Sequence, residues 1–150
     1  MNLLYNCAFD TIITQTTAGS SDLEGEKVLD MQGYEGVVFL GKINAITAAG
    51  ELEMYAQYSD STSTTDMVDD TGTRVGSTGA VTSTDWDDKL LVLDIYKPLK
   101  RFISVHIDKA TQNSEISVVG IRYGARKGPV TQSTEDFGVI DSGLFVSPTT

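Results

Sequence analysis

The stretch ELEMYAQYS, residues 51–59, decides the fold class because its side chains alternate in character along the chain. Every second residue from Leu52 to Tyr58 is apolar, and Glu, Tyr, Gln and Ser occupy the positions between and after them. A period of two is typical of a β-strand whose two faces meet different surroundings. The stretch therefore predicts a strand of a β-rich domain.

The preceding segment, GVVFLGKIN at residues 36–44, also reads as a strand. Its run VVFL, residues 37–40, predicts burial on both faces because no polar residue interrupts it. A short turn at residues 47–50 separates this segment from residues 51–59, so we expect the two to form a hairpin.

The same alternation extends outward from these two segments. Pro98 lacks a backbone donor, so we expect the strands on either side of it to meet at a corner or an edge. We expect the turn at residues 111–114 to close a second hairpin. No stretch sustains helical spacing. The other predicted strands are residues 26–31, 89–96, 101–109 and 115–123.

These short strands, at spacings of about ten residues, predict an all-β single domain, either an antiparallel β-sandwich of jelly-roll type or a small barrel. We take the sandwich as the prediction. Residues 1–150 form one domain, with an irregular N-terminal arm at about 1–22, a core at about 26–127 and a C-terminal tail at about 128–150. Residues 60–88 are rich in Asp, Thr, Ser and Gly. They predict a long acidic loop or a pair of weak edge strands.

Composition narrows the class of partner. The chain has 150 residues, 40% of them apolar, and a net charge of −10, which argues against nucleic acid as a partner. Cys7 is the single cysteine, so no intrachain disulfide is expected. We expect neither a signal peptide nor a membrane-spanning segment, because the longest apolar runs are far shorter than about 20 residues.

The charge is segregated along the chain. Residues 1–88 carry 15 acidic and 3 basic side chains, a balance of −12, whereas residues 89–127 carry 8 basic and 3 acidic, a balance of +5. We expect the corner at 96–101 and the strand end at 122–127 to converge as a subunit interface or a docking face for an acidic protein surface. A solvated strand edge protected by Lys and Arg is the alternative. The candidate interface residues are Tyr96, Lys97, Lys100, Arg101, Arg122, Tyr123, Arg126 and Lys127.

Candidate catalytic and metal-binding chemistry is sparse. His106 is the single histidine, and its place on an alternating strand favours a hydrogen-bonded structural role. Trp86 is expected to fold back onto the core. We expect no enzyme, no cofactor and no metal, since no nucleotide, zinc or EF-hand motif is present. The carboxylates considered for calcium are Asp66, Asp69, Asp70, Asp85, Asp87 and Asp88.

Four segments resemble a known family of small virion proteins of tailed bacteriophages, similar to head auxiliary proteins. They are LDMQGYEGVVF at residues 29–39, DKLLVLDIYKP at 88–98, KRF at 100–102 and GIRYGARKGPVT at 120–131. The resemblance spans roughly residues 26–131. Its motifs are strand and turn patterns and include no catalytic signature.

The resemblance implies a capsid decoration or cement protein that binds the outside of the mature head and stabilises it. The implied partner is the major capsid protein, and the implied location is the capsid surface of a virion whose parts are made in the host bacterial cytoplasm. Charge segregation suits ring-like self-association, for which we expect a trimer. The alternative is a host-recognition or carbohydrate-binding module of a tail or fibre.

Overall fold

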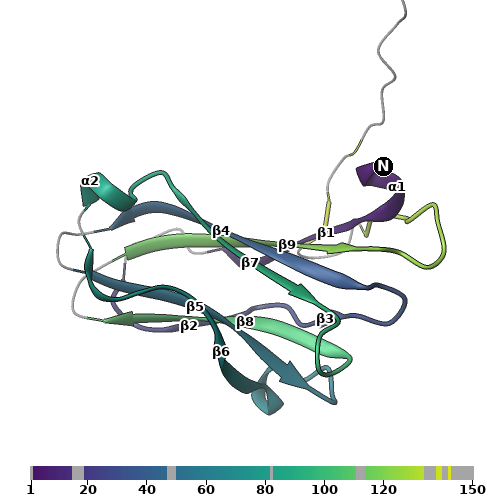
Figure 1. The fold of residues 1–150 in the computed structure, drawn as a ribbon, viewed down its shortest axis with the longest axis horizontal. Helices are drawn as coiled ribbons and strands as arrows, with labels where there is room; N and C mark the ends of the chain where they lie inside the picture. Colours follow the sequence, from purple (N-terminus) through teal and green to yellow (C-terminus); the bar gives the residue numbers. More distant parts are fainter. Residues whose placement is uncertain are drawn as a thin grey trace, which may run out of the picture.

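The computed structural model describes residues 2–14, 19–46, 50–81, 83–110, 114–133, 138–139 and 142. Two antiparallel sheets pack face to face (Figure 1). This arrangement confirms the prediction of an all-β single domain of sandwich type.

The strand order defines the topology of the sandwich. The four-stranded sheet has the order β1 (Ala8–Thr14), β9 (Ser114–Tyr123), β4 (Gly36–Ile46) and β7 (Leu90–Tyr96). The five-stranded sheet has the order β2 (Leu23–Glu24), β8 (Phe102–Ala110), β5 (Gly50–Ser59) and β6 (Val68–Val81), and β3 (Leu29–Asp30) also pairs with β8. The chain changes sheet at every connection except β2–β3 and β5–β6. This alternation is the order of a jelly roll, as predicted.

Both predicted hairpins are wrong. β4 pairs with β7 and β9, whereas β5 pairs with β6 and β8 in the other sheet. β8 and β9 likewise lie in different sheets. Alternation shows which side chains of a strand face inward, but it does not say which strand is the neighbour. The expected corner at Pro98 is confirmed, since β7 and β8 belong to different sheets.

The predicted irregular arm contains a strand. β1 pairs with β9, and its Ile12 and Ile13 are fully buried. A shift of register between Thr11 and Ile13 places two successive residues inward. The shift breaks the period of two, so the sequence pattern did not predict this strand.

The segment after the arm closes one side of the sandwich. Gly25 N donates to Val105 O at 2.9 Å, and Glu26 N donates to Ile12 O at 2.8 Å. These bonds tie the segment to one strand of each sheet. The predicted strand at 26–31 is correspondingly reduced to the two residues of β3, because the chain before it crosses between the sheets.

The acidic region 60–88 is more ordered than a loop. It contains a short 3-10 turn (Thr64–Asp66), the edge strand β6 and the helical turn α2 (Ser83–Trp86). β6 pairs with β5, although Asp and Gly interrupt its Val and Thr residues. One long edge strand therefore replaces the predicted loop or pair of strands. Trp86 packs against the core, as predicted.

The core lies between the sheets and is built from alternate residues of the long strands. Val37 and Phe39 are fully buried, whereas Val38 and Leu40 are half-buried on the outer face. The prediction that residues 37–40 are covered on both faces is therefore wrong, since no further layer of described residues covers β4. No helix in the described ranges is long and apolar enough to cross a membrane.

Lys109 is buried within the sandwich, with 4% of its surface exposed. Its Nζ donates to Ser114 O at 3.0 Å and to Gly19 O at 3.3 Å. Burial lowers the pKa of Lys109 to about 8, although the charge of Asp22 opposes this shift.

This pKa gives stability a pH dependence. Between pH 8 and 10.5 the unfolded chain holds a proton on Lys109 that the folded chain has released, so folding becomes more favourable as pH rises. From pH 7.5 to 9.5 we expect the free energy of unfolding of the wild type to gain about 2 kcal/mol relative to Lys109→Met, measured by urea unfolding. Cys7, whose pKa burial raises, acts in the opposite direction but is common to both proteins. A pH-independent difference between the two proteins would contradict the assignment.

Candidate functional site

Three turns far apart in the sequence meet at one end of the sandwich, on the right of Figure 1. They are residues 31–35 between β3 and β4, residues 97–101 between β7 and β8, and residues 124–127 after β9. Together they surround a shallow depression of about 500 Å³. We call the three turns and this depression the basic end. Its lining is Met31, Gln32, Tyr34, Glu35, Lys97, Pro98, Leu99, Lys100, Arg101 and Arg126.

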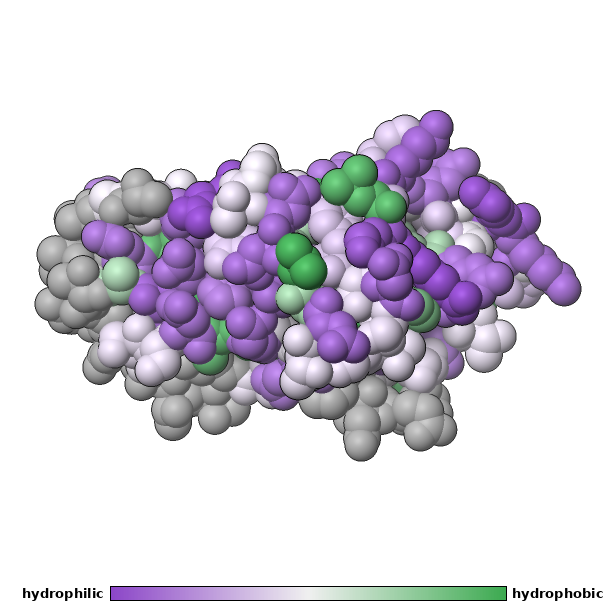
Figure 2. Space-filling model, turned by 90° about the horizontal axis from the view of Figure 1, so that it is seen from below, coloured by the Kyte–Doolittle hydropathy of each residue, from purple (hydrophilic) through white to green (hydrophobic). Residues whose placement is uncertain are grey.

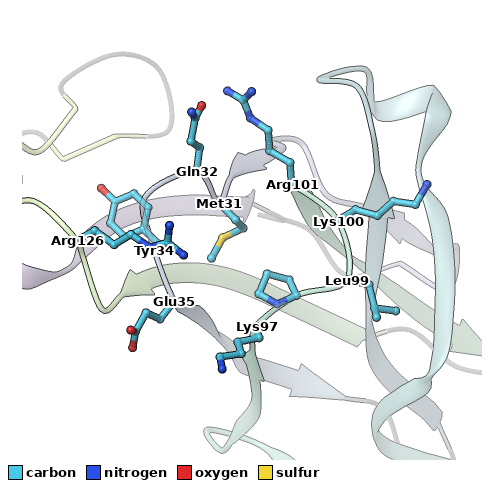
Figure 3. A pocket seen from close by; sticks show the side chains of 10 residues that line it. Met31, Gln32, Tyr34, Glu35, Lys97, Leu99, Lys100, Arg101 and Arg126 are labelled. Atoms are coloured by element: carbon cyan, nitrogen blue, oxygen red, sulfur yellow. The ribbon is translucent and has the colours of Figure 1, made fainter.

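Backbone hydrogen bonds hold the three turns together. The bonds run from Lys97 N to Glu35 O at 2.8 Å, from Met31 N to Arg101 O at 2.8 Å and from Arg126 N to Gly33 O at 2.9 Å. Because main-chain atoms make these bonds, the shape of the basic end does not depend on the long side chains around it. Figure 3 shows the Met31 side chain in the middle of the lining, between Gln32 and Arg101 on one side and Glu35 and Lys97 on the other.

Two cations of the basic end are already matched by carboxylates. Arg101 binds Asp30 through both Nε and Nη2, at 2.8 and 2.7 Å. The hydrogen bond from Arg101 holds the pKa of Asp30 below its usual range. Lys100 Nζ lies 2.6 Å from Asp60. These pairs are exposed, so they fix side-chain positions more than they stabilise the fold.

Three other cations at the basic end have no such match. Lys97, Arg126 and Lys127 form no ion pair with any carboxylate in the part of the chain that the structure describes. The Lys97 ammonium instead lies 5.2 Å from the ring centre of the exposed Tyr96. Leu99 is 79% exposed beside them. This turn therefore presents an exposed apolar side chain beside cations that no described carboxylate neutralises.

Arg122 points inward. Its Nη2 lies 2.9 Å from Asp10 Oδ2, and its Nη1 donates to Asp30 O at 2.8 Å. Its guanidinium also stacks over the ring of Tyr34, 4.8 Å from the centroid. The side chain of Asp10 is 1% exposed and is also bound by Lys27 at 2.5 Å. Arg122 therefore supports the basic end from beneath.

Tyr123 lies on the outer face of the four-stranded sheet, where its hydroxyl donates to Asp94 at 2.7 Å. Burial and this carboxylate raise the pKa of Tyr123 to about 12.

The structure brings together much of the predicted interface. Lys97, Lys100, Arg101 and Arg126 line the depression, and Tyr96 and Lys127 flank it. Sequence reasoning missed Met31, Gln32, Tyr34, Glu35 and Leu99. Leu99 carried the one usable signal, as a large apolar residue inside a charged turn next to a proline.

His106 has the structural role predicted for it. It is 8% exposed, its ring stacks on Tyr55 with centroids 4.9 Å apart, and its Nδ1 lies 2.8 Å from Glu24. It is thus enclosed by an aromatic ring and a carboxylate.

The Asp-rich region uses several carboxylates internally. Asp69 accepts from Gln57 at 2.8 Å, and Asp87 accepts from Ile46 N at 2.8 Å. Asp88 pairs with Lys42 at 2.8 Å. No group of three or more potential metal-ligating side chains gathers within the described ranges.

No protein-family model and no curated protein significantly matches this chain.

Proposed function

We propose that this chain is a structural protein of a tailed-phage virion, a capsid decoration or cement protein that binds the outside of the mature head. The basic end carries the proposal, because three separated turns present unmatched cations and an exposed leucine on a hydrogen-bonded frame. Such a surface suits a fixed acidic protein partner. The sequence resemblance to head auxiliary proteins names the major capsid protein as that partner.

The architecture is compatible with this role. Jelly rolls recur in capsid and lectin domains, so the fold alone does not decide between them. A cement protein needs many weak contacts on a repeating lattice, where multivalency multiplies their effect. We propose that the chain self-associates, as a trimer, on the capsid surface.

A capsid-binding assay tests the proposal. Purified protein is expected to cosediment with expanded capsids that lack it, and added salt should weaken binding because the contact is electrostatic. Lys97→Glu/Arg126→Glu should weaken binding at least tenfold. The matched control is Lys42→Glu/Lys89→Glu, which changes the charge equally at residues outside the basic end and should bind as the wild type does.

Two results would count against the proposal. If the wild-type protein does not cosediment with capsids at low salt, the capsid role is wrong. Saturable binding to host-cell envelopes would then favour a tail or fibre module. Equal losses in the two double variants would show that net charge matters and that the basic end does not. Thermal melts of each variant establish that it is folded.

A further inference from the structure

The outer face of the five-stranded sheet is strongly acidic, and Figure 2 shows that this side of the molecule is predominantly hydrophilic. On β5, Glu51 and Glu53 share a face with Tyr55, and the register pairs Glu53 with Asp108 and Tyr55 with His106 on β8. Glu24 pairs with His106 on the other side of β8. Six carboxylates lie on this acidic face. Asp22, Glu24, Glu51, Asp69 and Asp108 are exposed or half-exposed, whereas Glu53 is buried.

Few cations offset these carboxylates. Within the described part of the chain, Arg74 is the one Lys or Arg that forms an ion pair with any of the six, through Glu53. Its guanidinium also lies 5.0 Å from the centre of the Tyr55 ring. Burial raises the pKa of Tyr55 to about 12, and the charges of Asp69 and Asp108 add to this shift.

The same chain thus carries two complementary surfaces that face different directions. The basic end lies at the tip of the sandwich, whereas the acidic face is the flat side of one sheet (Figures 1 and 2). The bond between Lys100 and Asp60 matches charges at the edge of the basic end, but Lys97, Arg126 and Lys127 remain unmatched within the described chain. The acidic face of a second copy can supply carboxylates for these three cations.

We infer that the basic end of one copy docks against the acidic face of a second copy. This inference rests on the proposed function, since it names the partner surface for the self-association of the virion protein. The two surfaces differ, so the contact is head to tail. The basic end is also the proposed capsid contact, so a neighbouring copy and the capsid protein compete for it. Both surfaces lie on hydrogen-bonded backbone, so little ordering is needed on association.

Charge exchange between the two surfaces provides the test, in solution without capsids. The end variant is Lys97→Glu/Arg126→Glu, and the face variant is Glu51→Lys/Asp108→Lys. Glu51 and Asp108 suit this purpose because they make no side-chain ion pair with another described residue. Sedimentation velocity at low salt measures the mass of each protein alone and of their equimolar mixture.

Wild-type protein should form an oligomer that salt dissociates, and each variant alone should associate at least tenfold more weakly. The mixture should regain association, because the unmodified end of the face variant meets the unmodified face of the end variant, and the two reversed surfaces can also pair. Their strict alternation favours even-numbered complexes in the mixture. Lys42→Glu/Lys89→Glu is the control and should associate as the wild type does.

Three results would overturn the inference: a monomeric wild type, variants that associate as the wild type does, or folded variants whose mixture stays monomeric. Neutral substitutions, Lys97→Gln/Arg126→Gln and Glu51→Gln/Asp108→Asn, weaken the contact with less risk to folding and test it if a reversed variant is misfolded. A monomeric wild type that still cosediments with capsids would overturn this inference and leave the proposed function standing. An oligomer that does not bind capsids would contradict the proposed function and leave this inference standing.

Discussion

Replacing Asp10 by asparagine is expected to lower the free energy of unfolding by about 3 kcal/mol. The carboxylate is buried between Lys27 and Arg122, at 2.5 and 2.9 Å. Removing its charge leaves two cations facing a neutral amide, and the Arg122 guanidinium is largely shielded from water. The loss of one partner of a buried pair costs more than the pair contributes, because the remaining charge lacks solvation.

The matched control is Asp88→Asn. Asp88 also binds a lysine, Lys42 at 2.8 Å, but its side chain is 86% exposed. Water replaces the lost interaction there, so little or no change in the free energy of unfolding is expected. Urea unfolding of both variants at neutral pH measures the contrast. Equal effects of the two substitutions would mean that the charge of Asp10 has no special part in the fold.

Gly76→Ala is expected to cost about 3 kcal/mol or more. Gly76 lies in β6 with φ of +113°, a backbone conformation that residues with a side chain rarely adopt. A Cβ built there would lie 2.3 Å from Leu52 O and 2.9 Å from the Cα of Glu53. Both contacts are with the backbone of the paired strand, so relief requires β5 and β6 to separate.

Gly79→Ala in the same strand provides the comparison. Its nearest neighbour would be Ser77 Oγ at 3.6 Å, an ordinary contact distance. Its effect is expected to lie within about 0.5 kcal/mol, since alanine also restricts the unfolded chain. Thermal unfolding of the two variants, followed by circular dichroism, measures the difference. A Gly76→Ala protein that melts with the Gly79→Ala protein would exclude strain at Gly76.

The sequence predicted strands where alternation was regular, as in β5, β7 and β8. The sequence failed to predict strands where the register shifts or where polar residues and glycines interrupt the alternation. The register shift after Thr11 breaks the alternation of β1. In β6, Asp and Gly residues interrupt the Val and Thr residues, so the sequence pattern did not identify the strand that pairs with β5. Strand partners were beyond reach, because the same inward face serves a hairpin and a crossover equally well.

The basic end was predictable in part for a related reason. The charge pattern along the chain identified the cations. The corner at Pro98 led to the expectation that residues 96–101 and 122–127 lie close together. The orientation of Arg122 was not predictable, because it depends on Asp10, a residue of the supposed arm. The turn at residues 31–35 was missed because it carries no cation, so the charge pattern that identified the other two turns did not include it.

Pairing of β1 with β9 has a consequence for the order of folding. Ala8 aligns with Arg122, so the first strand meets a partner made more than a hundred residues later. Contacts between such distant segments form slowly, because a long loop must close before they contribute stability. During synthesis the four-stranded sheet stays incomplete until the chain has passed Tyr123. The turn that carries Arg126 follows directly, so the basic end forms only after the four-stranded sheet is complete.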